Sequence, residues 1–140
     1  MCLLNKLIQM ISNFRYENDS TNQGWTTRTV SSSPDIDGAY AVFACDLDND
    51  GDFDILSTSW YDKKVQWFEN DGTCLSFTSH LITNSRNDPC SIEAADIDRD
   101  GDLDILAVFA EGVVAWYGTF GVFQYISFRY VLYFYLQKLS

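Results

Sequence analysis

Short runs of β-branched and aromatic residues recur along the chain, and clusters of Asp, Asn, Gly and Ser separate them. Runs of four to eight residues between such turn signals predict β-strands joined by hairpins rather than helices. Four runs follow one another in the middle of the chain, and three more follow them. The predicted strands are Tyr40–Cys45, Asp54–Trp60, Val65–Glu69, Phe77–Ile82, Ser91–Ala95, Asp104–Ala110 and Val113–Tyr117.

The strand pattern repeats along the chain. Residues 40–60, placed on residues 90–110 at an offset of 50, are identical at nine of 21 positions. At an offset of 52, residues 16–19 and 25–30 fall on similar residues at 68–71 and 77–82. Four antiparallel strands in each repeat of about fifty residues are typical of a β-propeller blade.

The chain is too short to close a propeller ring. It has 140 residues, whereas four blades of this length would need about 200. We therefore predict an all-β fold of antiparallel four-stranded blades in an incomplete ring. The predicted segments are an unassigned N-terminal segment (1–13), the end of a preceding blade (14–35), a complete blade with an acidic loop (36–85), a partial blade with a second acidic loop (86–117) and an aromatic, apolar tail outside the pattern (118–140).

Negative charge is concentrated in two loops. The net charge of −11 excludes the kind of basic surface that binds nucleic acids or anionic membranes. Ten of the 20 acidic residues lie in residues 46–54 and 96–104, which share the frame D-x-D-x-D-G-D-x-D. Carboxylates at alternate positions of a curled loop can converge on a hard cation, and a set of six or more oxygens suits calcium better than magnesium.

Each acidic loop is predicted to hold about one structural calcium ion (Ca2+). Positions 1, 3, 5 and 9 supply carboxylates, position 7 supplies its main-chain carbonyl, and the glycine at position 6 allows the turn. Two carboxylates about 5 Å apart repel by about 3 kcal/mol at an effective dielectric constant of 20, so the loop should spread without a cation. The predicted metal residues are Asp46, Asp48, Asp50, Asp52, Asp54, Asp96, Asp98, Asp100, Asp102 and Asp104.

Two other interpretations of the loops compete with calcium binding. In one, the loops are solvated acidic turns, although two such loops in register with a repeat favour a metal. An EF-hand would need a bidentate Glu at position 12 and flanking helices. Position 12 is Ser57 in one loop and Ala107 in the other, and β-type residues follow both loops.

The stretch VFACDLDNDGDFDILSTSW, followed by KKVQWFENDG and FTSHLIT, resembles the VCBS/FG-GAP-like repeat of calcium-binding β-propellers, which is related to the integrin α-chain head. The resemblance covers residues 14–117. It implies a seven- or eight-bladed propeller in the parent protein, at an extracellular or cell-surface location, with calcium in the hairpin that joins the first two strands of a blade. The chain lacks the Phe-Gly-Gly-Ala-Pro-like stretch of the integrin subtype, so the VCBS type is the nearer likeness.

The sequence offers no catalytic constellation, since it contains no GxSxG motif and no glycine-rich phosphate loop. His80 occupies the position of Arg28 in the preceding repeat, which indicates a solvent-facing strand residue. We therefore expect a non-catalytic segment that serves adhesion or the binding of protein or carbohydrate ligands outside the cell. The alternatives are the propeller portion of a secreted lyase or hydrolase whose active site lies on missing blades, and a nonfunctional gene fragment.

Other features leave alternatives open. Trp67 and Trp116 recur in matching strands and predict either packing between blades or sugar-stacking platforms. The cysteines show no zinc-ligand spacing; Cys74 and Cys90 could bridge two turns or stay unpaired.

Residues 120–137 are compatible with a fourth strand, a membrane helix interrupted by Arg129, or a truncated gene end. Exposed blade faces and this tail predict self-association, and the N-terminus does not read as a signal peptide.

Overall fold

The computed structural model of the chain describes residues 14–18, 25–31, 35–118 and 123–127. Within these residues the fold is all-β and every strand pair is antiparallel, as the sequence predicts. The N-terminal segment 1–13 and most of the tail lie outside this part of the chain. The strands are β1 (Phe14–Asn18), β2 (Trp25–Thr29), β3 (Ala39–Cys45), β4 (Asp54–Ser59), β5 (Val65–Asn70), β6 (Phe77–Thr83), β7 (Pro89–Ala95), β8 (Asp104–Phe109), β9 (Val113–Tyr117) and β10 (Phe123–Ser127).

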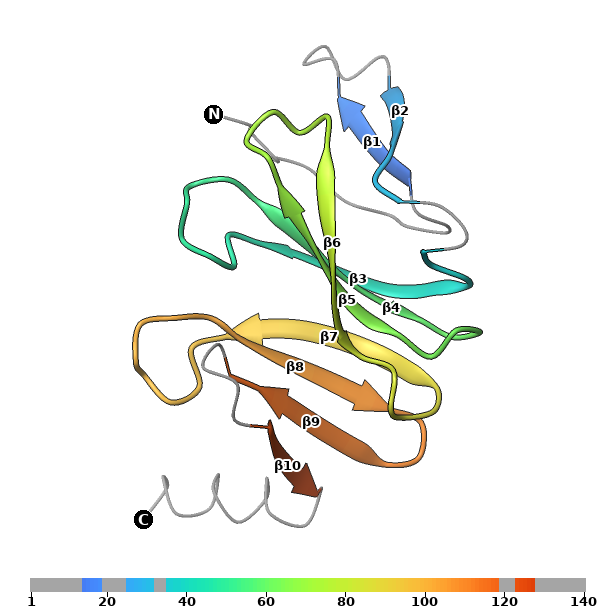
Figure 1. Cartoon of the computed structure of the whole chain (residues 1–140), viewed down its shortest axis with the longest axis vertical. Helices are drawn as coiled ribbons and strands as arrows, with labels where there is room; N and C mark the ends of the chain where they lie inside the picture. The colour runs from blue at the N-terminus through green and yellow to red at the C-terminus, as the bar shows by residue number, and fades with distance from the viewer. Residues whose placement is uncertain (1–13, 19–24, 32–34, 119–122, 128–140) are drawn as a thin grey trace.

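Two four-stranded sheets make up most of the molecule (Figure 1). One has the strand order β3-β4-β5-β6 and the other the order β10-β9-β8-β7, so neighbours in each sheet are neighbours in sequence. All seven strands predicted in residues 40–117 are confirmed, with ends that differ by two residues at most. The fourth-strand alternative is confirmed for Phe123–Ser127, which pairs with β9. Each sheet is therefore a four-stranded meander of the kind found in propeller blades.

The repeat continues at the N-terminal side. β1 and β2 pair with each other in register from Phe14↔Thr29 to Asn18↔Trp25. The alignment at an offset of 52 places them on β5 and β6, the last two strands of the first blade. Val30, which follows β2, packs against a small core that contains Ile36, Ile55 and Phe68. The end of one blade thus contacts one face of the next.

The main hydrophobic core lies between the two four-stranded sheets. β3 and β4 pack against β7, and Leu56 and Ala107 are fully buried where the sheets meet. Trp67 packs against this cluster, which confirms for Trp67 the prediction of packing between blades. In β8, the core-facing residues Ile105, Ala107 and Phe109 alternate along the strand, because successive side chains point to opposite faces of a sheet. The buried members of the cluster are Cys45, Leu47, Leu56, Val65, Ile92, Ile105, Ala107, Phe109, Ala115 and Tyr117.

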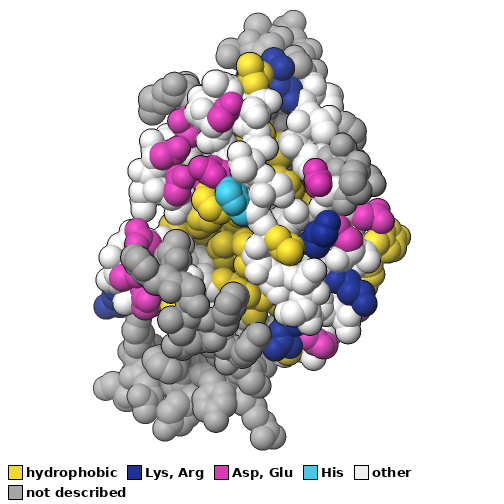
Figure 2. Space-filling view, in the orientation of Figure 1, with side chains coloured by type: hydrophobic (Ala, Val, Ile, Leu, Met, Phe, Trp, Pro, Cys, Tyr) yellow, Lys and Arg dark blue, Asp and Glu magenta, His cyan; other side chains and the backbone are white. Residues whose placement is uncertain are grey.

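The two sheets stack as successive blades, and the described strands do not close a ring (Figure 1). The loops that join β3 to β4 and β7 to β8 lie on the same side of the stack, at the left in Figure 1. In the same orientation, acidic side chains gather along this side (Figure 2). Within the described ranges, no segment forms a helix with the length and hydrophobicity needed to span a bilayer.

The cysteine pairing considered from the sequence is wrong. Cys74 is disulfide-bonded, whereas Cys90 is free, so no bridge joins Cys74 to Cys90. The Cys90 thiol instead lies 3.4 Å from the main-chain carbonyl oxygen of Val108, to which it donates. Strand pairing fixes Cys90 in β7 next to β8, while Cys74 lies in the turn between β5 and β6.

Candidate metal centre

The two acidic loops have the same backbone conformation. The residue at position 4 is in the left-handed region in both, with φ of 62° at Asn49 and 66° at Arg99. At position 6, φ is 95° at Gly51 and 100° at Gly101, values that residues with a side chain rarely adopt. A Cβ atom on either glycine would meet no other atom within 4 Å. Glycine is therefore required at position 6 by the backbone conformation rather than by crowding.

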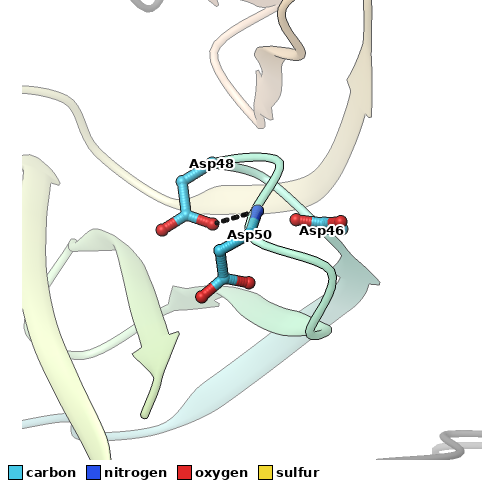
Figure 3. A group of neighbouring side chains, drawn as sticks. All are labelled: Asp46, Asp48 and Asp50. Carbon is cyan, nitrogen blue, oxygen red and sulfur yellow. Dashed lines mark hydrogen bonds between the residues drawn. The ribbon is translucent and has the colours of Figure 1, made fainter. Parts of the chain in front are cut away.

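A ladder of hydrogen bonds curls the first loop. The main-chain N–H of Asp50 donates to Asp48 Oδ1 (3.3 Å), that of Asp52 donates to Asp50 Oδ1 (2.9 Å), and that of Gly51 donates to Asp46 Oδ2 (3.0 Å). Figure 3 shows the first of these bonds beside the three carboxylates. Asp46, Asp48 and Asp50 each use one carboxylate oxygen in these bonds and have a second oxygen beside it.

The second loop repeats this ladder. The main-chain N–H of Asp100 donates to Asp98 Oδ1 at 3.2 Å, and that of Asp102 donates to Asp100 Oδ1 at 3.0 Å. The N–H of Gly101 donates to Asp96 Oδ2 at 3.3 Å. Because the same bonds form fifty residues apart, the frame D-x-D-x-D-G-D-x-D itself determines how the loop curls.

Three carboxylates converge in each loop. In the first loop, oxygens of Asp46, Asp48 and Asp50 all lie within 4.8 Å of one another. In the second loop the same holds for Asp96, Asp98 and Asp104. Positions 1 and 3 thus contribute to both groups, with position 5 added in one and position 9 in the other. The geometry is suited to a metal ion with oxygen ligands.

The position 9 carboxylates are buried at the base of the loops, and they differ. Asp54 uses both oxygens: Oδ2 accepts from the N–H of Leu47 at 3.2 Å and Oδ1 from that of Asn70 at 2.8 Å. Asp104 Oδ2 accepts from the N–H of Ile97 at 2.9 Å, while its Oδ1 has no hydrogen-bond partner among the residues that the structure describes. Asp104 is only 1% exposed, so a carboxylate oxygen without a donor is unfavourable there, and a cation could offset its charge.

The side chains at position 7 are not part of either converging group. Asp102 Oδ1 accepts a hydrogen bond from Asn49 Nδ2 of the other loop at 3.3 Å. Asp52 Oδ2 lies 3.1 Å from where a Cβ on Gly72 would stand, so it faces the turn between β5 and β6. Asp100 also lies outside the second group, although its Oδ1 accepts from the N–H of Asp102 as Asp50 Oδ1 does from that of Asp52.

Clustering of carboxylates changes their protonation. Desolvation raises the pKa of Asp48, and the negative charges of Asp54, Asp50 and Glu69 raise it further, against the hydrogen bond from Asp50. The pKa of Asp98 is raised in the same way, by desolvation and then by the charges of Asp100 and Asp104. Without a cation these groups hold protons more tightly than an isolated Asp does.

Cys45 lies directly before the first loop. Burial raises the pKa of its thiol to about 12, and the carboxylates of Asp54 and Asp46 contribute to the rise. The thiol is therefore neutral at physiological pH, and Cys45 acts as a small apolar residue of the main core.

Asn70 organises the first loop, although the sequence reasoning did not single it out. Its Nδ2 donates to the carbonyl oxygen of Phe53 at 3.1 Å, at the end of the loop. Its Oδ1 accepts from the N–H groups of Gly72 (3.2 Å) and Cys74 (3.0 Å) in the next turn. The signal was present, since Glu-Asn-Asp recurs at residues 17–19 and 69–71 of the aligned repeats.

His80 lies in β6 beside β5, and not in either acidic loop. Its Nε2 is 2.7 Å from Glu69 Oε2, and its ring stacks on Trp67 with 4.5 Å between centroids. The side chains of His80 and Glu69 are 40% and 39% exposed, so the pair is open to solvent. This placement agrees with the solvent-facing strand position expected from the repeat.

Together, the four-stranded meanders and the acidic loop between the first two strands of each define blades of the β-propeller class. Residues 46–107 match the family model of the FG-GAP-like repeat. The match confirms, over these residues, the resemblance seen in the sequence. No curated protein and no solved structure gives a significant match to the chain.

Proposed function

We propose that this β-propeller segment binds calcium through its two acidic loops. The observation that carries the proposal is the same in both: three carboxylates converge, and a buried carboxylate oxygen has no hydrogen-bond partner in the described part of the chain. These oxygens are Asp46 Oδ1 in the first loop and Asp104 Oδ1 in the second. A buried anionic oxygen without a donor is unfavourable, and a cation would relieve that penalty.

The donor set favours calcium over other metals. All groups on offer are oxygens, which excludes the soft ligands that zinc or copper prefer. The ligands that we propose are the carboxylates of positions 1, 3, 5 and 9 together with the main-chain carbonyl of position 7. Calcium accepts six to eight oxygens in irregular geometry, whereas magnesium demands a regular octahedron. The proposed ligand residues are Asp46, Asp48, Asp50, Asp52, Asp54, Asp96, Asp98, Asp100, Asp102 and Asp104.

The role of the ion in this proposal is structural. It would hold each hairpin in its curled form, so that the loops at the rim keep a fixed shape for a protein or carbohydrate ligand. An extracellular or cell-surface location is part of the proposal, since calcium is abundant there. The disulfide at Cys74 supports it, because disulfides persist in oxidising compartments. We propose no catalytic step for the segment.

Calcium titration tests the proposal. We expect the full chain to bind about two ions with dissociation constants of about 10⁻⁴–10⁻³ M, the range of extracellular sites, and to melt at a higher temperature in calcium than in chelator. The double variant Asp48→Ala/Asp98→Ala should lose both effects. A matched control is Asp35→Ala/Glu93→Ala, which removes two exposed charges outside the loops and should keep them.

The result that would reject the proposal is a folded chain, verified by circular dichroism, that takes up no calcium. The binding role has its own test, which is retention on immobilised glycans and extracellular matrix proteins in calcium and in chelator. Calcium-dependent retention supports it, whereas turnover of a polysaccharide by the chain would favour an enzyme instead.

A further inference from the structure

One hydrogen bond joins the two acidic loops. Asn49 Nδ2 in the first loop donates to Asp102 Oδ1 in the second at 3.3 Å, although the two residues are 53 positions apart. Both loops lie on the same side of the stacked sheets (Figure 1). The bond therefore links the two candidate calcium sites directly, across the contact between blades.

Both ends of this bond come from the loop frame. Asn49 is at position 4, where φ is 62°, and it lies between the converging residues Asp48 and Asp50. Asp102 is at position 7, and its main-chain N–H donates to Asp100 Oδ1, as part of the ladder that curls the second loop. Ordering of either loop therefore fixes one partner of the bond.

Asn49 is suited to this contact because it is neutral. Each loop carries five carboxylates, so their charges repel one another where the loops meet. An acidic residue at position 4 would add to that repulsion, whereas an amide donates a hydrogen bond to a carboxylate without adding charge. Position 4 of the second loop is Arg99, which has the same backbone conformation and is likewise a donor.

We propose that the Asn49–Asp102 hydrogen bond couples the two loops, so that calcium in the first loop strengthens calcium binding in the second. This proposal rests on the calcium function proposed above and adds its regulation. A cation that orders the first loop fixes Asn49, and Asn49 then holds Asp102 in the conformation that the second loop needs. Because coupling is reciprocal, calcium in the second loop strengthens the first by the same factor.

Two effects of opposite sign act between the sites, and this makes the proposal testable. Ordering through the hydrogen bond strengthens the second site, while repulsion between two bound cations weakens it. If ordering dominates, disabling the first loop weakens the second loop. If repulsion dominates, disabling the first loop strengthens the second.

The experiment follows each loop separately by NMR during a titration of the full chain with calcium chloride. The reporters are the amides of Gly51 and Gly101, which donate to Asp46 and Asp96 within their own loops. The variant is Asn49→Gly, because glycine keeps the positive φ at position 4 and removes only the side chain. Asp48→Ala provides a second variant, in which the first loop is expected to lose calcium binding.

We expect Asn49→Gly to raise the calcium midpoint at Gly101 by about threefold to tenfold, the effect of losing one hydrogen bond. Asp48→Ala should raise the Gly101 midpoint as well, and Asn49→Gly should add nothing in that background. An unchanged or lowered Gly101 midpoint in Asn49→Gly would overturn the coupling while leaving calcium binding intact. Gly51 and Gly101 amides that do not respond to calcium in the folded wild-type chain would overturn the calcium function and the coupling with it.

Discussion

At the scale of single residues, each acidic loop brings together carboxylates whose charges repel one another. Raised pKa values at Asp48 and Asp98 show that the folded chain without a metal disfavours the ionised carboxylates. A group whose pKa is higher in the folded than in the unfolded chain lowers stability above that pKa. The penalty is present in full at neutral pH and is relieved as the pH falls through the raised value.

Asp48→Asn should therefore stabilise the chain in chelator. Asn keeps the oxygen that accepts from the N–H of Asp50 and removes the charge that Asp54 and Asp50 repel. We expect the melting temperature at pH 7 to rise by roughly 2 °C, and the gain to shrink as acid protonates Asp48 in the wild-type chain. Stabilisation by calcium should be lost. Melts from pH 7 to pH 4, in chelator and in calcium, measure both effects.

Asp62 provides the opposite control. Burial acts against its charge, but the Ser59 hydroxyl, the Lys64 ammonium and the N–H of Asp37 together lower its pKa. Because a lowered pKa stabilises the fold above it, Asp62→Asn should lower the melting temperature at pH 7, and the loss should vanish as the pH falls through the lowered value. If Asp48→Asn instead melts at a lower temperature than the wild-type chain, in chelator at pH 7, then the charge of Asp48 does not destabilise the folded chain.

At the scale of elements, the first blade is held together at its loops as well as by strand pairing. Asn70 ends β5 and bonds to the end of the acidic loop and to the turn that leads to β6. It is 2% exposed, so water does not replace these bonds when the side chain is removed. One side chain therefore fixes two loops on the same edge of the sheet.

Asn70→Ala should lower the free energy of unfolding by about 2–3 kcal/mol, because it leaves the buried N–H of Cys74 and the carbonyl of Phe53 without partners. Urea unfolding followed by circular dichroism measures the change. The matched control is Leu75→Ala in the same turn, where the side chain is 67% exposed and the change should stay within about 0.5 kcal/mol. Equal losses in the two variants would show that the bonds of Asn70 contribute nothing beyond its place in the turn.

At the scale of the whole molecule, the two blades depend on one shared core. Leu56 in β4 is fully buried in the cluster that also contains Ile92 and Ala107 of the second blade. Tyr61 and Leu81 are 73% and 54% exposed, so apolar surface also stays open to solvent. Self-association of the chain stays a prediction, because apolar surface of this kind is usually covered by a partner.

Leu56→Ala should lower the free energy of unfolding by about 3 kcal/mol, since it removes buried methyl groups and leaves a cavity between the sheets. Both blades should then unfold together at lower urea concentration. Hydrogen exchange of β5 and β8 amides reports each blade separately, and Leu81→Ala, at an exposed position, is the control. Protection lost in β5 but kept in β8 would show that the blades are independent.

The sequence by itself determined the strands, the turns and the curled acidic loops. These follow from local patterns: β-type residues along Tyr40–Cys45, glycine at position 6, and Asp side chains that hydrogen-bond to the backbone a few residues onward. A pattern that repeats at an offset of 50 also indicated stacked blades. The turns and the curled loops can be predicted from the sequence because the residues that interact in them are close together along the chain.

Only the tertiary structure decided which carboxylate oxygens of the predicted ligands accept hydrogen bonds from the main chain. Asp54 turns both oxygens to main-chain N–H groups, one of them on Asn70 sixteen residues away. Asp104, at the same position of the second loop, has one buried oxygen to which no described residue donates. The contact of Asn49 with Asp102 likewise depends on how one blade packs on the next. Side-chain rotation and packing between distant segments set these differences, and neither is specified by the spacing of residues in a repeat.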